Sequence, residues 1–230
     1  MGDAIASPRS GDDYPHSMMC MGCGSPTANL APTSHVSPPM EKLLFLDRLA
    51  DAAPLSARCR AELLPGLRVR HLAQGTLFSR RAASPAEIVL IVSGIARVSV
   101  VTTDGCDVTQ HFARAEEFVM PRLDPARDHL YDAEAVTDVV AVALSLERFE
   151  RAMTHYPELS AFYAALLRER SMWARERRSR GEDIESYEQF LSLYPGLETQ
   201  VPTVHLASYL GLSPAEYMRV RQRYRDRAVM

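Results

Sequence analysis

Residues Thr203 to Arg223, reading TVHLASYLGLSPAEYMRVRQR, constrain the fold of this chain more than any other segment. Two short helices that cross at a steep angle need a small residue where their backbones touch, and a turn residue that tolerates positive φ. Ala207 and Gly211 stand at those two places. The segment therefore predicts a helix-turn-helix.

The second helix of this unit has a marked start and two distinct faces. Ser213 is suited to the N-cap, Pro214 to the first helical position, and Glu216 completes a capping box three residues after the cap. With Tyr217 and Val220 turned inward, helical geometry turns another set of side chains outward. This outward set consists of Ala215, Met218, Arg219, Gln222 and Arg223.

The charge of the C-terminal segment favours a polyanionic partner. Five arginines against two acidic residues give 201–230 a formal charge of +3, although the whole chain carries -3. Docking depends on the local charge rather than the total. Arg219 is the candidate for a bidentate contact to guanine, and the other arginines are candidates for phosphates. The alternative is a solvated, arginine-rich helix of another bundle. The candidate DNA-contact residues are Ser213, Ala215, Met218, Arg219, Gln222 and Arg223.

The middle of the chain alternates short apolar runs with turn residues. Many short β-branched segments at this spacing predict a sandwich or barrel. The turn at 103–105, Thr-Asp-Gly, has hairpin chemistry. The expected strands are Leu67 to Leu72, Thr76 to Ser79, Ile88 to Val92, Ala96 to Thr102, Val108 to Phe112 and Ala133 to Leu144.

A helical region is expected from Leu146 into the 180s, with a break near Pro157. A narrow apolar stripe recurs along it at spacings of three, four and seven, which suits a seam between two helices. The alternative is an amphipathic helix that packs on its own β domain. The stripe consists of Leu159, Phe162, Leu166 and Trp173.

Three segments in the same order resemble the Crp/Fnr superfamily of transcription regulators between about Leu49 and Tyr224. They are PLSARCRAELLPGLRVRHLAQGTLF for an entry helix and first strands, IVLIVSGIARVSVVTTDG for a central hairpin, and PGLETQVPTVHLASYLGLSPAEYMRVR for a short winged helix-turn-helix ending. The resemblance implies an α+β fold with a β jelly roll of the cyclic-nucleotide-binding type. The implied domains are a disordered tail (1–39), the jelly roll with its entry helix (40–157), a long dimerisation helix (158–183) and a helix-turn-helix domain (184–230).

The resemblance also implies a function and partners. A chain of this type would be a cytoplasmic, homodimeric regulator that binds specific sites in double-stranded DNA, with RNA polymerase as a further candidate partner and no membrane association. Pairing two recognition helices would place half-sites about 34 Å apart. No catalytic signature or HExxH motif is present, so no enzyme activity is expected. At the positions of Ala215 and Met218 the family usually has polar side chains that contact DNA bases. A jelly-roll protein that binds a ligand or partner, with a degenerate helix-turn-helix, is therefore the alternative function.

Control by a cyclic nucleotide is not expected. Family members that bind one cradle its phosphate with a short helix introduced by Gly and Glu, and with an Arg followed by Ser or Thr. In the corresponding stretch, 112–138, Ala115 and Glu116 take the place of the glycine, and Pro121 and Pro125 remove amide donors. Neither Arg122 nor Arg127 is followed by a hydroxyl residue, and Glu116 and Glu117 would repel the anion.

The first 39 residues differ from the rest in composition. They contain six of the fifteen prolines and show no apolar periodicity, which is typical of a disordered tail. Met40 opens the first periodic segment and is an alternative translation start. Cys20 and Cys23 have metal-ligand spacing, so a redox or metal sensor is a minor alternative. One branch of the Crp/Fnr superfamily senses oxygen through N-terminal cysteines and a further cysteine in the β domain. Cys59 and Cys106 do not stand where that branch places its further cysteine. No cofactor or metal is therefore assigned.

Overall fold

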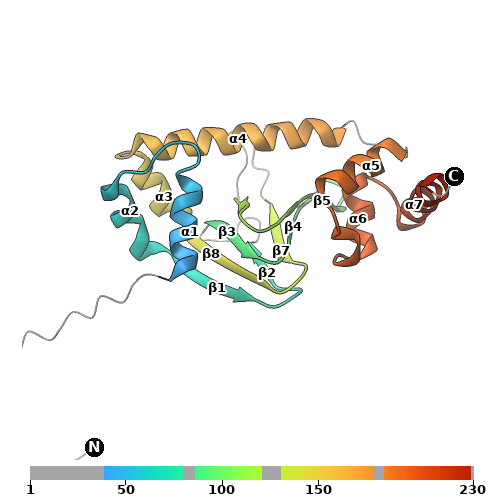
Figure 1. Ribbon diagram of the computed structural model, residues 1–230, viewed down its shortest axis with the longest axis horizontal. Coiled ribbons are helices and arrows are strands. Elements are labelled where there is room, and N and C mark those ends of the chain that lie inside the picture. The colour runs from blue at the N-terminus through green and yellow to red at the C-terminus, as the bar shows by residue number, and fades with distance from the viewer. Residues whose placement is uncertain (1–38, 80–85, 121–130, 179–183, 229–230) are drawn as a thin grey trace, which may run out of the picture. The chain divides into compact units, whose positions relative to one another are not determined.

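The computed structural model describes residues 39–79, 86–120, 131–178 and 184–228; of these, 169–178 and 228 are described by their backbone alone. The described residues form eight strands, which lie in the chain order between two groups of helices (Figure 1). The first helices are α1 (Met40–Leu49), α2 (Ala57–Leu63) and the short η1 (Leu64–Gly66). The strands are β1 (Arg68–Leu72), β2 (Leu77–Ser79), β3 (Glu87–Ser93), β4 (Ala96–Val101), β5 (Asp107–Ala113), β6 (Phe118–Val119), β7 (Asp132–Ala135) and β8 (Val139–Ser145).

The strands build two four-stranded antiparallel sheets. One has the order β1-β8-β3-β6 and the other the order β2-β7-β4-β5. The short apolar runs of the sequence therefore form the expected jelly-roll sandwich. The run from Ala133 to Leu144 is not one strand, because it divides into β7 in one sheet and β8 in the other. Strand β6 is not among the expected strands, and its two residues pair with Val89 and Leu90 of β3.

Both faces of the central strand β3 are buried, and alternate residues serve each face. Val89 and Ile91 of β3 pack in the layer between the two sheets. Ile88 and Leu90 point the other way, into a core shared with α1 and the helices that follow β8. Phe118 of β6 joins this second core, with its ring centroid 5.3 Å from that of Phe45 in α1.

Gly94 makes the tight connection between β3 and β4 possible. Its φ is +87°, a conformation that residues with a Cβ rarely adopt. A Cβ at this position would also stand only 2.1 Å from the carbonyl oxygen of Asp138. Substitution here would force the β3–β4 and β7–β8 connections apart.

The expected break near Pro157 is present. After β8 the chain forms α3 (Leu146–Met153) and then α4 (Pro157–Arg178), which begins at the proline. The structure changes the interpretation of the apolar stripe on α4. Leu159, Phe162 and Leu166 are buried in the core of the chain's own sandwich domain, and the Phe162 ring lies 4.9 Å from that of Phe118. These three positions therefore cannot form a seam with another chain. The Trp173 side chain lies outside the described residues.

The C-terminal helices form a third core. They are α5 (Ile184–Leu193), the short η2 (Leu197–Thr199), α6 (Thr203–Leu210) and α7 (Pro214–Ala228). Their core consists mainly of aromatic and leucine side chains, and it continues onto Phe112 of β5. Residues 184–228 contain helices and turns only, so the wing expected from the resemblance has no counterpart in this segment.

Candidate nucleic-acid interface

Helices α6 and α7 are joined through a glycine turn. Gly211 ends α6 with φ +74° and ψ 24°, the left-handed conformation that favours glycine. The N–H of Leu212 donates to the carbonyl oxygen of Ala207 at 2.9 Å, and the Ala207 side chain is completely buried. The small residue and the turn glycine thus have the positions that the sequence predicted for them.

A capping box fixes the start of α7. The N–H of Glu216 donates to Oγ of Ser213 at 3.3 Å, and the N–H of Ser213 donates to Oε2 of Glu216 at 2.8 Å. Each residue thereby satisfies a backbone donor of the other, which stabilises the first turn. Ser213 consequently acts as a cap in this structure.

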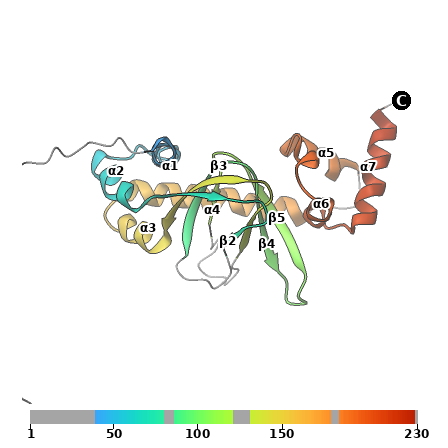
Figure 2. The ribbon, with the colours of Figure 1, turned by 90° about the horizontal axis from the view of Figure 1, so that it is seen from below.

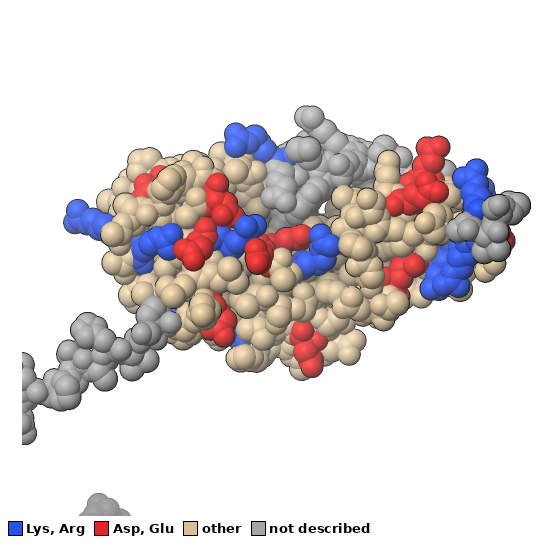
Figure 3. Space-filling view, in the orientation of Figure 1, with Lys and Arg blue, Asp and Glu red and all other residues tan. Residues whose placement is uncertain are grey.

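The two faces of α7 differ sharply in burial. Tyr217 and Val220 are 1% and 3% exposed and pack into the C-terminal core. The expected outward face is exposed at every position, and basic side chains gather over α7 in Figure 3. Those exposed residues are Ala215, Met218, Arg219, Gln222 and Arg223.

Two polar residues of the exposed face have partners on the same helix. The Arg219 side chain is 73% exposed, and its Nη2 lies 3.9 Å from Oε1 of Glu216. Gln222 donates from Nε2 to Asp226 at 2.7 Å. Both interactions lie at the surface, where such pairs are weak. Arg219 and Gln222 can therefore turn to another acceptor at little cost.

Glu198, for which no sequence pattern predicts a role, anchors the buried face of α7. Its Oε1 accepts hydrogen bonds from the hydroxyls of Tyr187 in α5, at 2.5 Å, and Tyr217 in α7, and it forms an ion pair with Arg221 at 3.3 Å. Burial and the bond to Glu198 raise the pKa of both tyrosines, so both remain protonated donors. One carboxylate thus joins α5, η2 and α7. The density of tyrosines in 187–224 was the available sequence signal.

Helix α6 rests on strand β5. The hydroxyl of Ser208 accepts from the N–H of Thr109 at 2.9 Å and donates to the carbonyl oxygen of Asp107 at 3.3 Å. The aromatic ring of Tyr209 lies 5.7 Å from that of Phe112. Figures 1 and 2 both place α6 between β5 and α7.

A buried histidine links the same strand to the end of α5. Nδ1 of His111 is hydrogen-bonded to the hydroxyl of Tyr194 at 2.9 Å, and Nε2 to Oε2 of Glu117 at 3.0 Å. Arg114 lies over the Tyr194 ring at 5.3 Å. Burial raises the pKa of Glu117, but hydrogen bonds from His111 and Arg114 outweigh it and hold that pKa below its usual range.

The stretch compared with cyclic-nucleotide pockets lies partly outside the described residues, since 121–130 are not described. Glu116, at the place of the expected glycine, has φ +69°, which is uncommon for a residue with a Cβ. The Glu117 carboxylate is bound to His111 rather than free. The described residues of this stretch, 112–120 and 131–138, contain Ala115 and the two glutamates but no glycine that could bind a phosphate through its backbone N–H.

The cysteines and histidines form no metal centre within the described ranges. No group of three or more metal-ligating side chains occurs there. Cys59 is buried and Cys106 is exposed, whereas Cys20 and Cys23 lie outside the described residues. In the same ranges, no helix has the length and apolar character required to cross a bilayer.

Comparison of the whole structure with solved structures identifies the fold. A transcriptional regulator of the Crp/Fnr family from Eubacterium rectale aligns with a TM-score of 0.63 over 75% of this chain and 85% of its own, at 15% identity. The chain has the Crp/Fnr fold. FixK2 from Bradyrhizobium japonicum aligns with a TM-score of 0.61 at 13% identity, covering 70% and 86% of the two chains.

A third similar structure is CLP, a c-di-GMP responsive global regulator from Xanthomonas campestris. It has a TM-score of 0.59 at 16% identity, covering 75% of this chain and 93% of its own. No protein-family model matches the chain, and no curated protein matches its sequence. The Crp/Fnr fold is thus shared with proteins whose sequences are only 13–16% identical to this one.

Proposed function

We propose that this chain is a homodimeric transcription regulator that binds specific sites in double-stranded DNA through α7. The observation that carries the proposal is the contrast between the two faces of this helix. Tyr217 and Val220 fix one face in the core, while the opposite face is exposed and rich in arginine. A rigid helix with a basic, accessible face has the properties required to enter the major groove.

Each residue of the exposed face has a proposed role. Arg219 donates two parallel hydrogen bonds to guanine after leaving Glu216, and Met218 contacts a thymine methyl. Gln222 and Ser213 provide further polar groups, and Arg223 neutralises a phosphate. Because Ala215 is also apolar, the operator differs from that of relatives with polar side chains at these positions.

The proposed homodimer pairs two copies of α7 on one operator. Since Leu159, Phe162 and Leu166 are buried in their own domain, the pairing surface is the opposite side of α4. Ala161 and Ala164 are exposed there. Two copies then read half-sites about 34 Å apart.

We also propose that this regulator is not controlled by a cyclic nucleotide. Glu117 already uses its carboxylate to bind His111, and Arg114 lies over Tyr194 rather than facing a free anion site. The proposed regulator has domain boundaries at 39, 157 and 183. We further propose that it interacts with RNA polymerase at the promoter.

The test is selection of genomic fragments with the purified full chain at near-physiological salt, followed by gel shifts on the enriched sequence. A two-fold symmetric motif bound with dimer stoichiometry is the expected result, and Arg219→Ala should relax the base preference at one position in each half-site. Arg58→Ala, which removes an exposed arginine from α2, is the matched control and should bind like the wild type. Weak, salt-sensitive binding without sequence preference would instead support the degenerate helix-turn-helix that Ala215 and Met218 suggest.

A further inference from the structure

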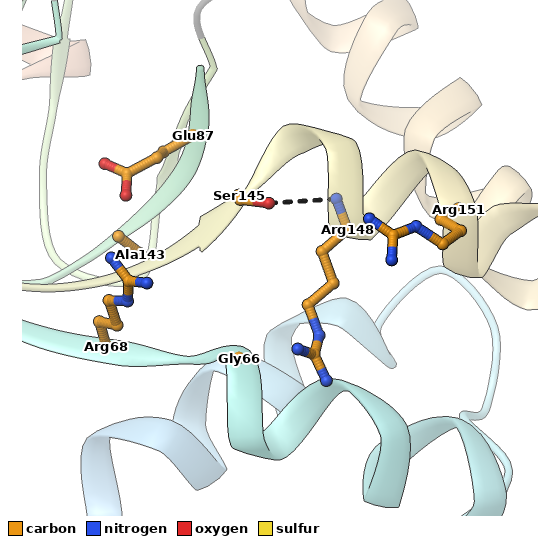
Figure 4. A pocket seen from close by; sticks show the side chains of 7 residues that line it. All are labelled: Gly66, Arg68, Glu87, Ala143, Ser145, Arg148 and Arg151. Carbon is orange, nitrogen blue, oxygen red and sulfur yellow. Dashed lines mark hydrogen bonds between the residues drawn. The ribbon is translucent and has the colours of Figure 1, made fainter. Parts of the chain in front are cut away.

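A cavity of about 210 Å³ opens at one end of the β1-β8-β3-β6 sheet, far along the chain from α7 (Figure 4). Its walls combine small and basic residues. Gly66, Ala143 and Ser145 contribute little side-chain volume, which leaves the hollow unfilled. Long arginine side chains from β1 and α3 line it, together with Glu87 of β3.

The sheet register brings these residues together. Arg68 of β1 is the pairing partner of Ala143 in β8, and Glu87 of β3 is the partner of Ser145. Paired residues of antiparallel strands project from the same face. Arg68 and Glu87 therefore lie on the same face of the sheet. The end of β8, with the small side chains of Ala143 and Ser145, lies between them.

Helix α3 places the second arginine. Ser145 caps this helix by accepting the N–H of Arg148 at 3.1 Å, and the Arg148 guanidinium donates from Nη2 to the carbonyl oxygen of Glu62 at 2.7 Å. A Cβ on Gly66 would lie 2.6 Å from Cδ and Nε of Arg148. The glycine therefore makes room for the arginine side chain at the edge of the cavity.

The charges at the cavity are not balanced. Glu87 is neutralised by Arg70 at 2.8 Å, and Arg151 pairs with Glu147 at 2.8 Å. Within the described ranges, Arg68 and Arg148 have no carboxylate within ion-pair distance. Buried Nε of Arg148 also has no hydrogen-bond acceptor. Among the residues that the structure describes, Arg68, Arg70, Arg148 and Arg151 against Glu87 and Glu147 leave a formal charge of +2 around the cavity.

We propose that this cavity binds the phosphate group of a small molecule. A dianionic phosphate balances the excess charge, whereas a single carboxylate balances only half of it. Guanidinium groups match phosphate oxygens in geometry, and the Ser145 hydroxyl adds a further donor. Among the described residues of 112–138, the stretch compared with cyclic-nucleotide pockets, none lines this cavity. The site is independent of the proposed DNA interface.

The test uses inorganic phosphate and the full-length protein. Isothermal titration calorimetry at pH 7.5 and low ionic strength should show saturable binding of one phosphate per chain. Arg68→Gln and Arg148→Gln should each weaken this binding at least tenfold. Arg58→Gln removes the same charge from an exposed position on α2 and should leave it unchanged.

A charge-neutral variant separates the geometry of the cavity from the overall charge of the protein. Gly66→Ala should displace Arg148 and also weaken phosphate binding. If Arg148→Gln fails to fold, exposed Arg68 still provides the test. The absence of saturable binding, equal loss in Arg58→Gln, or tighter binding of succinate than of phosphate would each overturn the proposal. Because the titration contains no DNA, its result is separate from that of the operator assay.

Discussion

Removal of the Glu198 carboxylate should destabilise the C-terminal helices strongly. In Glu198→Ala, the buried hydroxyls of Tyr187 and Tyr217 lose their acceptor and Arg221 loses its ion-pair partner. A hydrogen bond to a charged group contributes about 1.5–3 kcal/mol. Since the Glu198 side chain is 18% exposed, water will replace part of two such bonds. We expect a loss of about 2–4 kcal/mol in the free energy of unfolding.

Urea unfolding followed by circular dichroism measures this loss. Glu188→Ala is the control, because Glu188 is exposed on the same helix as Tyr187, and it should change stability by less than about 0.5 kcal/mol. Adding Tyr187→Phe and Tyr217→Phe to Glu198→Ala should recover about 1–2 kcal/mol, since no buried hydroxyl then lacks an acceptor. Stability of Glu198→Ala within 0.5 kcal/mol of wild type, or further loss on adding the phenylalanines, would refute the assigned role.

Four further outcomes are expected. Arg219→Ala should relax base preference at one position in each half-site, at a cost of about 1–3 kcal/mol, and unchanged preference in a binding selection would remove its assigned role. Ser213→Ala should cost about 1 kcal/mol in urea unfolding because the capping box is lost, whereas Ser213→Asp should retain it. The pKa of Glu117 is lowered in the folded protein, so its carboxylate stabilises the fold above the ordinary pKa of 4.5, and this contribution is lost as the pH falls through the folded pKa. The difference in unfolding free energy between wild type and Glu117→Gln should therefore shrink on acidification below pH 4.5. A constant difference would contradict this. Burial raises the pKa of Cys59 to about 11, so peptide mass spectrometry should find slower alkylation at pH 8 than for exposed Cys106, and equal rates would be inconsistent with the structure.

Local chemistry made the strands and the helix-turn-helix predictable. The glycines at 105 and 211 adopt positive φ, and Ser213 and Glu216 form the expected capping box. These features depend on residues close together in the chain, so their spacing carries the information. The burial of Tyr217 followed from helical periodicity for the same reason.

Long-range packing was less predictable. The spacing of Leu159, Phe162 and Leu166 fits both a helix pair and a helix on a sheet, and only the position of Phe118 settles which surface they meet. Glu198 is one acidic residue among many until the fold brings two tyrosine hydroxyls to it. The contact between Thr109 and Ser208 spans 99 residues, and neither residue has a distinctive local pattern.

The position of α6 on β5 has a consequence for aggregation. Strand β5 is the last strand of its sheet, and such an edge offers unpaired backbone groups to any other strand. The Ser208 hydroxyl accepts a hydrogen bond from the N–H of Thr109 and donates one to the carbonyl oxygen of Asp107, so it occupies backbone groups that a neighbouring strand would otherwise bind. If the C-terminal helices move away from the sandwich, this edge becomes open to pairing with another chain. The helices that carry the proposed DNA interface thus also protect the sheet against misassembly.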